Sequence, residues 1–331
     1  MNTYAEAMVA KRKALKLNQP AFAQWLNERL GRRYDRVRIS KMENGNEPVP
    51  AIVRLLLQPP PDDAARTKTV AIVNQKGGVG KTTAAVHISY ALAAAGHATL
   101  LVDMDAQANA TMHLGIVSSV LEKAGKTVYD VLLKGAKISD VILPVSERHP
   151  LHVVPSSDYM AAAEMEMTNQ LAREYLLHNA LKPIKPQFRF ILIDCPPVLG
   201  HATINALAAA DQVIIPTETA TFSIAGIRVL MNTIENVQSR INPHLEIFGV
   251  IPQLVDGGTN QDRESMKDLV ALYGHLRIFP RVPRTILYKA AVAAGKSLFE
   301  YDANAKGLDV YADVASSLIE SASLENLCHG S

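Results

Sequence analysis

The sequence lacks the residues and segments that would place it outside the cytosol. Its 331 residues include only two cysteines, Cys195 and Cys328, which excludes a disulfide framework and indicates a reducing compartment. No apolar run reaches the roughly 18 residues that a membrane-spanning helix needs, and the first residues lack the apolar segment of a secretory signal. We therefore expect a cytoplasmic protein that makes no contact with a membrane.

Aromatic residues are also scarce, at 5% of the chain, and they are not interleaved with basic residues. A surface that stacks the bases of single-stranded nucleic acid needs such interleaving, so the composition gives no support for one. The apolar fraction is 48%, which is enough for an ordinary buried core in a chain long enough for two domains.

Charge is distributed unevenly along the chain. Residues 1–68 contain 13 Lys and Arg against 7 Asp and Glu, whereas residues 69–331 contain 21 against 25. A small basic module attached to a slightly acidic body suggests an anionic partner for the module. Charge alone favours this interpretation no more than it favours a solvated basic face.

Three consecutive prolines mark the clearest boundary, in the segment Gln58-Pro59-Pro60-Pro61-Asp62-Asp63. Proline can neither continue a helix nor pair within a sheet, so the segment predicts a stiff, extended linker. We accordingly divide the chain into an N-terminal module at 1–57, a Pro-rich linker at 58–68 and a second domain at 69–331.

Beyond the linker, short apolar runs alternate with segments of helical periodicity. The apolar runs predict strands at 69–74, 98–103, 188–193, 211–215, 245–251 and 276–279. Helices are expected at 82–95, 161–181, 201–210, 223–239, 261–273 and 308–322. This alternation predicts an α/β fold with a mostly parallel sheet and helices on both faces.

The most specific motif lies between the first strand and the first helix of the second domain. It reads Lys76-Gly77-Gly78-Val79-Gly80-Lys81-Thr82-Thr83. The glycines allow backbone N–H groups to surround phosphate oxygens, and the helix that follows directs its positive dipole end at the same anion. Lys81 supplies a charge to the β- and γ-phosphates, and the Thr82 hydroxyl is a ligand for Mg²⁺. The motif therefore predicts a phosphate loop that binds ATP.

The loop departs from the common form G-x-x-x-x-G-K-[ST], which requires glycine at position 75. This chain has Gln75 there and an additional lysine, Lys76, directly after it. The alternative is a glycine-rich turn that contains lysines by chance. The strand before the motif and the helix after it argue against this alternative.

Three acidic residues stand where predicted strands end. Asp103 and Asp105 follow the second strand, and Asp194 follows the strand at 188–193. Ligands of parallel sheets collect at the carboxyl ends of the strands, so all three carboxylates can face the phosphate loop. One would hold the hydrated Mg²⁺ and another would position the attacking water, although a single aspartate at a strand end is more often a cap or a turn former.

Three segments together resemble the motifs of the ParA/MinD family of ATPases. KGGVGKTT resembles the family's deviant Walker A motif, VDMDAQANAT its Walker A′ motif and LIDCPP its Walker B motif. Weaker similarity extends over roughly residues 69–322, through PTE at 216–218, FSIAG at 222–226, PR at 280–281 and YD at 301–302. The resemblance implies a P-loop NTPase fold and hydrolysis of ATP with Mg²⁺.

The resemblance also implies roles for the loop lysines and threonines. Lys76 would reach across a dimer interface to the partner's ATP, and Lys81 would bind the β- and γ-phosphates. Thr82 would ligate Mg²⁺, and Thr83 would contact the α-phosphate. Each subunit would complete the other's site, so ATP would become part of the interface of a homodimer.

Among the acidic residues, the resemblance implies that Asp105 orients the attacking water and that Asp194 holds the water shell of the metal. We count Asp103 with Thr82 and Asp194 as a candidate metal-site residue. Two features depart from the family. Ala106 stands where proline is frequent, and the segment Val282–Ala290 is longer than usual, which bears on the DNA contact expected of Arg284.

The N-terminal module resembles the helix-turn-helix of Cro-type repressors, on the string Asn18-Gln19, Ala23, Ile39, Ser40 and Met42-Glu43-Asn44-Gly45. Helices are expected from Asn18 to Leu30 and from about Val37 to Glu43. The second helix would lie in the major groove of DNA. The candidate DNA contacts are Gln19, Arg36, Arg38, Ser40 and Lys41. The alternative is a helical dimerisation arm with a solvated basic face.

These observations predict a partition ATPase that forms an ATP-dependent homodimer, binds DNA without sequence preference when ATP is bound, and represses its own promoter through the helix-turn-helix. We expect a ParB-like centromere-binding partner and a location on the nucleoid. A nucleotide-sensing transcriptional repressor and a ParA-like ATPase that positions another cargo remain alternatives. A MinD-like membrane ATPase needs a basic amphipathic helix, which the neutral-to-acidic end SSLIESASLENLCHGS does not provide.

Overall fold

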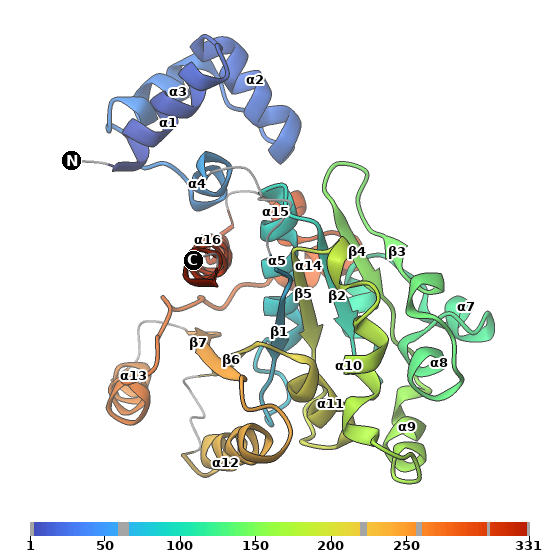
Figure 1. The fold of residues 1–331 in the computed structure, drawn as a ribbon. Coiled ribbons are helices and arrows are strands. Elements are labelled where there is room, and N and C mark those ends of the chain that lie inside the picture. The colour runs from blue at the N-terminus through green and yellow to red at the C-terminus, as the bar shows by residue number, and fades with distance from the viewer. Residues whose placement is uncertain (1–2, 59–65, 219–223, 256–259, 303–304, 330–331) are drawn as a thin grey trace.

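The structure of the protein, a computed structural model, describes residues 3–58, 66–218, 224–255, 260–302 and 305–329 (Figure 1). Within them, a seven-stranded sheet has the order β3-β4-β2-β5-β1-β6-β7. Its strands pair in parallel except β3, which pairs antiparallel with β4. They are β1 (Lys68–Ile72), β2 (Thr99–Asp103), β3 (Leu143–Pro144), β4 (Leu151–Val154), β5 (Phe190–Asp194), β6 (Gln212–Glu218) and β7 (Glu246–Gln253).

Helices cover both faces of the sheet, and their apolar side chains form two separate cores. Successive residues of a strand point to opposite faces, so Val70 and Ile72 of β1 enter one core and Ala71 enters the other. The first core includes α5 (Lys81–Ala94), α15 (Leu298–Tyr301) and α16 (Leu308–His329). The second includes α8 (Val128–Leu133), α9 (Met160–Met167), α10 (Leu176–Leu181), α11 (His201–Ala209), α12 (Ile224–Arg240) and α13 (Asn260–Tyr273). The predicted α/β fold with helices on both faces is confirmed.

Three further short helices are α6 (Asn109–His113), α7 (Ser118–Lys123) and α14 (Leu287–Ala293). In the part of the chain that the structure describes, no helix is both long enough and apolar enough to cross a membrane.

Two predicted elements were wrong in extent. The expected helix at 161–181 is interrupted, because Ala172 adopts a left-handed conformation (φ 50°) between α9 and α10. The Asn205 side chain satisfies the interrupted backbone by donating to the Arg173 carbonyl and accepting from the Leu177 N–H. This contact comes from a distant helix, so local periodicity could not predict it.

The expected strand at 276–279 forms a single bridge, between Ile278 and Val250. Pro280 follows at once and has no N–H to extend a ladder. Conversely, β4 was not predicted, because its four residues include the polar His152 and give too short a pattern.

The N-terminal module consists of α1 (Thr3–Ala14), α2 (Gln19–Leu30) and α3 (Arg36–Glu43), followed by α4 (Ala51–Leu57). The Asn18 side chain accepts the Ala21 N–H at 2.9 Å, which caps α2 as expected. Both predicted helices of the module are confirmed within a residue or so. The structure does not test whether they act as a helix-turn-helix.

Helix α4 attaches the module to the body of the protein. It packs on α5 and α16, and Arg54 pairs with Asp313 at 3.4 Å. Gln58 donates to the Ser316 hydroxyl at 2.6 Å, and the Ala51 N–H donates to Asp309 at 3.4 Å. The division at 57 and 69 stays a prediction, and residues 59–65 of the linker lie outside the described residues.

A buried carboxylate holds the three helices of the module together. Glu43, at the end of α3, accepts two hydrogen bonds from Arg12 of α1, at 2.6 and 3.0 Å, and one from Gln19 of α2 at 2.8 Å. Burial acts to raise the pKa of Glu43, but the hydrogen bonds from Arg12 and Gln19 outweigh it and lower the pKa overall.

Replacing Arg12 with alanine leaves this carboxylate buried with fewer partners, so we expect the module to lose about 2–3 kcal/mol of unfolding free energy at pH 7. Trp25 is the single tryptophan of the chain and stacks on Phe22, so its fluorescence during urea unfolding reports on the module itself. Because the folded-state pKa of Glu43 is lowered, the loss should shrink as the pH falls below the ordinary value of 4.5.

Arg33→Ala, at an exposed position of the same module, is the matched control and should change the unfolding free energy by less than about 0.5 kcal/mol. Identical unfolding of the wild type and Arg12→Ala at pH 7 would contradict this role of Glu43.

Candidate functional site

The loop between β1 and α5 has a backbone that only glycine fits at two positions. Gly78 and Gly80 have positive φ angles of 74° and 85°, which side chains tolerate poorly. A Cβ on Gly80 would also lie 3.1 Å from the side chain of Gln253. Gly80 directly precedes Lys81, the first residue of α5, so the loop leads into the N-terminus of a helix.

A pocket of about 500 Å³ opens beside this loop, within the usual range for small-molecule sites. The loop and the start of α5 border it through Gly77, Gly78, Gly80, Lys81, Thr82 and Thr83. Segments far apart in the sequence form the rest of its wall. They include Asp105 and His113 after β2, Pro197 after β5, and Gln253, Tyr288 and Val292.

Lys81 lies at the floor of this pocket and is almost fully buried. Its ammonium group donates to the Lys76 carbonyl at 3.1 Å. Burial lowers the pKa of Lys81, and the nearby Asp194 carboxylate counteracts part of that shift. A buried ammonium with one backbone acceptor retains donors for an anion in the pocket.

Asp194 and Asp103 occupy paired positions at the ends of the adjacent strands β5 and β2. Asp194 is fully buried, and neither of its oxygens has an aligned hydrogen-bond partner. Burial and the neighbouring Asp103 raise the pKa of Asp194 well above its ordinary value, whereas the nearby Thr82 hydroxyl and Lys81 act in the opposite direction. Burying a carboxylate without a hydrogen-bond partner destabilises the fold unless a cation or a water molecule binds to it.

Asp103 is equally buried but fully hydrogen-bonded. It accepts from the Thr111 N–H at 2.9 Å, from the Thr111 hydroxyl at 2.7 Å and from the Asp105 N–H at 3.1 Å. Burial nevertheless raises the pKa of Asp103 to about 6. These contacts fix the start of α6, and they leave Asp103 less available to a metal than Asp194.

The donor set of Thr82 and Asp194 fits a hydrated Mg²⁺. Among the described residues, no group of three or more His, Cys, Asp and Glu is arranged to hold a metal on its own. Mg²⁺ rarely needs such a cage, because it keeps several waters and takes one or two protein ligands together with substrate phosphates. The unpartnered oxygens of Asp194 and the Thr82 hydroxyl at the pocket provide that kind of site.

Asp105 borders the same pocket and accepts the Gln107 N–H at 3.0 Å. The structure therefore places Asp105, Lys81 and Thr82 at one cavity, with Asp194 buried close to all three. Their catalytic and metal-binding roles stay predictions.

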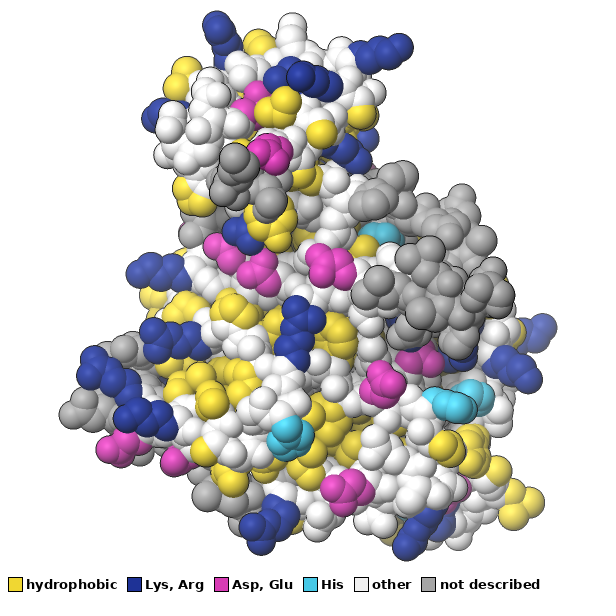
Figure 2. Space-filling model, turned by 60° about the vertical axis from the view of Figure 1, so that its left-hand side comes forward, with side chains coloured by type: hydrophobic (Ala, Val, Ile, Leu, Met, Phe, Trp, Pro, Cys, Tyr) yellow, Lys and Arg dark blue, Asp and Glu magenta, His cyan; other side chains and the backbone are white. Residues whose placement is uncertain are grey.

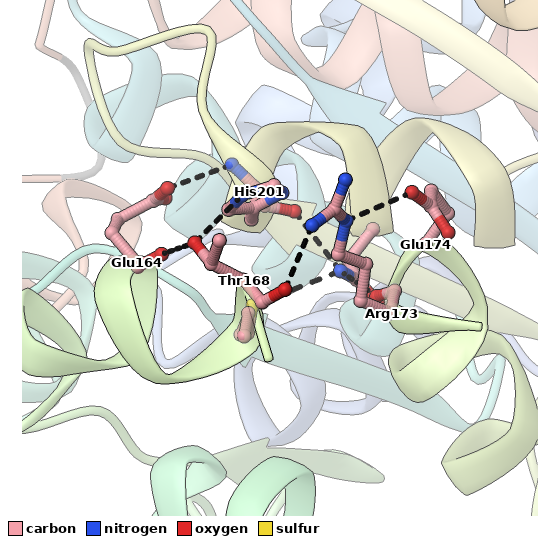
Figure 3. A network of polar contacts seen from close by, with 7 residues as sticks. Glu164, Thr168, Arg173, Glu174 and His201 are labelled. Carbon is pink, nitrogen blue, oxygen red and sulfur yellow. Dashed lines mark hydrogen bonds and ion pairs between the residues drawn. The ribbon is translucent and has the colours of Figure 1, made fainter. Parts of the chain in front are cut away.

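The connection from Asp194 to α11 is fixed by a carboxylate from another helix (Figure 3). Glu164 of α9 accepts the N–H groups of His201 and Ala202 at 2.7 and 3.0 Å, and so caps the N-terminus of α11. A Cβ on Gly200 would lie 2.5 Å from the same carboxylate, so a side chain there would displace the Glu164 cap. This cap holds the connection whose Pro197 borders the pocket.

Lys76 does not enter the pocket of its own chain. Its ammonium group pairs with Glu218 at 2.7 Å, and Arg284 pairs with the same carboxylate at 3.3 Å. Both basic side chains remain partly exposed, at 42% and 50%. Arg284, which we expected to contact DNA, thus shares an acidic partner with Lys76.

The other candidate DNA contacts divide into two groups. Gln19 donates to Glu43, and Arg38 pairs with Glu47 at 2.7 Å, so both have partners inside the module. Arg36, Ser40 and Lys41 instead border a shallow hollow on the surface of α3. Figure 2 shows Lys and Arg side chains spread around the module at the top of the molecule, in keeping with its net positive charge.

Three residues near the pocket had no motif that could reveal them: His113, Gln253 and Tyr288. Each comes from a segment without a recognisable spacing, and only the fold brings them to the loop.

Comparisons with known proteins find similar sequences and a similar fold. The family model described as an AAA domain matches residues 67–247, which begin after the N-terminal module. The sporulation initiation inhibitor protein Soj of Bacillus subtilis is 39% identical over 249 residues, covering 75% of this chain and 96% of Soj. The chromosome partitioning protein ParA of Myxococcus xanthus is 37% identical over 244 residues, covering 74% of this chain and 85% of that protein.

A solved structure is similar over a comparable length. Cobyrinic acid a,c-diamide synthase from Mycobacterium smegmatis, with bound ATP analogue and magnesium, aligns with a TM-score of 0.67 at 32% identity. The alignment covers 80% of this chain and 97% of that one.

The unpaired carboxylate predicts an unusual stability effect. Asp194→Asn removes a buried charge whose cost of burial exceeds the stabilisation from Thr82 and Lys81, so the ligand-free protein should gain about 1–2 kcal/mol of unfolding free energy at pH 7. Since the pKa of Asp194 is raised in the folded state, its ionisation destabilises the fold as the pH rises above the ordinary value of 3.8. The advantage of the variant should therefore vanish as the pH falls towards 4 in urea titrations.

Asp103→Asn is the matched control and should have the opposite sign. Whichever way the amide turns, its nitrogen meets a donor, either at Thr111 or at the Asp105 N–H. We expect this to outweigh the removal of a charge that burial disfavours, with a loss of about 1–3 kcal/mol. If both variants lost stability to the same extent, Asp194 would have to be satisfied in the ligand-free protein.

Proposed function

The chain belongs to the ParA/Soj family of ATPases, and on this basis we propose that it is a partition ATPase whose ATP-bound dimer binds DNA. The observation that supports this most is a buried lysine and a glycine loop at one pocket, with the buried Asp194 carboxylate close to Lys81 and Thr82. That combination suits a nucleotide whose phosphates and metal satisfy all three.

The phosphate loop would hold the nucleotide through its backbone. N–H groups of residues 77–83 surround the phosphates, and the N-terminus of α5 adds its dipole. Lys81 would turn from the Lys76 carbonyl to the β- and γ-phosphates. Thr83 would contact the α-phosphate.

Thr82 and Asp194 would hold Mg²⁺, which neutralises charge on the β- and γ-phosphates when bound. Asp103 would support them by fixing the start of α6 through Thr111. Asp105, at the edge of the pocket, would orient the attacking water.

Lys76 would act in the dimer rather than in its own subunit. It is partly exposed and pairs with Glu218 at 2.7 Å, so it must leave this partner to reach the ATP of a second copy. A surface ion pair of this kind contributes only about 0–1 kcal/mol, which does not oppose such an exchange. Hydrolysis in the dimer would then remove the contact that joins the subunits.

DNA would be bound in two ways. Basic residues on the body, with Arg284 as a candidate, would bind without sequence preference in the ATP dimer. The module would bind an operator through Arg36, Ser40 and Lys41 of α3, with Gln19 and Arg38 in supporting positions. A ParB-like protein at a centromere site would stimulate hydrolysis, and the protein would be found on the nucleoid.

A nucleotide-sensing repressor is the second candidate. The docking of α4 on α5 and α16 favours it, because the helix that begins at the phosphate loop also supports the module. The two candidates differ in whether binding to DNA without sequence preference depends on ATP. A ParA-like ATPase that moves a cargo other than DNA would also bind nonspecific DNA with ATP, and differs only in its partner.

We expect the wild type to bind long nonspecific DNA only with ATP, and Lys76→Ala to lose this binding because its dimer cannot form. Gel-shift or anisotropy titrations with ATP, ADP and no nucleotide measure it at one fixed salt concentration, since phosphate contacts weaken steeply with salt. Lys123→Ala removes an exposed lysine of α7 and is the matched control, which should bind as the wild type. Binding that ignores the nucleotide would favour the repressor instead.

For the module, Lys41→Ala and Arg36→Ala should each weaken binding to the protein's own promoter. Loss of one phosphate contact should lower the salt slope of the affinity by about 1, and loss of a base contact should cost about 1–3 kcal/mol. ATP-dependent binding to nonspecific DNA should be unaffected. Promoter binding that survives both changes would favour the dimerisation arm.

A further inference from the structure

Another cavity, of about 220 Å³, lies where the N-terminal module meets the body of the protein. Its wall combines five segments: α1, α2 and α4, the C-terminal end of α5, and the turn before β4. Three of the residues that line it are cationic, namely Lys11, Arg29 and Arg148, and among the described residues no Asp or Glu borders it. The cavity therefore concentrates positive charge from both parts of the chain.

Two of these cations come from the module and are held by neutral groups. The Arg29 guanidinium lies 4.3 Å from the centre of the Trp25 ring, in a cation–π contact. The Lys11 ammonium donates to the Gln58 carbonyl at 3.4 Å. Such contacts orient a cation without neutralising it. Within the part of the chain that the structure describes, none of the three cations forms an ion pair.

Arg148 reaches the cavity from the body of the protein. A Cβ on Gly31 would lie 3.1 Å from a guanidinium nitrogen of Arg148, so this side chain lies against the C-terminal end of α2, where the helix dipole favours a cation. Burial lowers the pKa of the neighbouring His149, and the nearby Glu300 counteracts part of that shift. The Glu300 carboxylate is already engaged, because it accepts the N–H and the hydroxyl of Ser297 at 3.1 and 2.8 Å.

The chemistry of this cavity suits a phosphate group. Cations that border one cavity repel one another unless an anion binds between them. Guanidinium groups match phosphate oxygens with two parallel hydrogen bonds, and the lysine adds a compact charge with further N–H donors. The rings at the cavity are already occupied, because Trp25 stacks on Phe22 and carries Arg29. His149 packs edge-on against Tyr90, so neither ring is available to stack on a heterocyclic base.

We propose that this cavity is an anion site, which binds a phosphate group between Lys11 and Arg29 of the module and Arg148 of the body. The bound phosphate joins the two parts, because it contacts cations from both. The site is separate from the nucleotide pocket, since it lies at the C-terminal end of α5, whose 14 residues span about 20 Å from the phosphate loop. It requires neither nucleotide hydrolysis nor an operator.

Trp25, the single tryptophan of the chain, borders the cavity, so its fluorescence reports on the cavity directly. Pyrophosphate is titrated into the full-length wild type, Arg148→Gln and Arg29→Gln at one fixed ionic strength. We expect a saturable change in the wild type. Each variant should bind about tenfold more weakly, because it loses a charge-assisted hydrogen bond to the anion.

Two further variants serve as controls. Arg33→Gln removes the same charge from an exposed position of the module outside the cavity, and it should bind as the wild type. Lys81→Ala alters the phosphate loop at the other end of α5, and it should leave the Trp25 titration unchanged. Thermal unfolding of every variant verifies that it is folded.

Three results would overturn the anion site. The first is the absence of any saturable change in the wild type. The second is an equal loss of affinity in Arg33→Gln and Arg148→Gln, which would reflect the overall charge of the protein. The third is a signal that disappears in Lys81→Ala and persists in Arg148→Gln, which would locate the pyrophosphate at the phosphate loop.

A free phosphoanion and the DNA backbone carry the same group, and a short DNA duplex of random sequence distinguishes them. If Arg148→Gln weakens binding of the duplex as much as it weakens binding of pyrophosphate, the phosphate at this site comes from DNA. If the wild type and Arg148→Gln bind the duplex equally, the ligand is a free phosphoanion.

Discussion

The buried carboxylate of Asp194 is the constraint around which the rest of the pocket is arranged. It ends a central strand beside the equally buried Asp103, and the nearby Thr82 hydroxyl and Lys81 offset only part of the cost of burying it. The surrounding fold must hold this charge in place without neutralising it, which requires rigid support on every side. After β5, Glu164 fixes the chain by capping α11, and after β2, the contacts between Thr111 and Asp103 fix it. Helix α5 begins at Lys81, next to the phosphate loop. We expect this charge to lower the stability of the ligand-free protein, and a bound cation would relieve that cost.

Much of this site could be predicted from the sequence because its central parts are local. The loop at 76–83 is contiguous, and the strand-end positions of Asp103, Asp105 and Asp194 follow from the rule that parallel strands end at one edge. Gln253 and Glu164 could not be predicted. Their partners lie 58 and 37 residues away, and neither stands in a pattern with chemical meaning. The sequence also could not predict that Asp103 has aligned hydrogen-bond partners and Asp194 has none, because this depends on Thr111 donating to Asp103.

The N-terminal module illustrates the same limit. Its charge and its helices follow from composition and capping, so the sequence predicts them well. The sequence does not predict which basic side chains are paired inside the module. Arg12 pairs with Glu43, and Arg38 pairs with Glu47. A basic patch can offer a partner only the charge that remains after such internal pairing. The remaining charge can be determined only from the three-dimensional structure.

Helix α16 connects the pocket to the N-terminal module. The helix has 22 residues and so measures about 33 Å, and its contacts with both the pocket wall and α4 come from residues 309–316. Tyr311 braces the pocket wall there, while Asp309, Asp313 and Ser316 carry α4. The pocket wall and α4 are therefore both attached to the same helix. A displacement of α16 would therefore move the pocket wall and α4 together, and the module that α4 attaches would move with them.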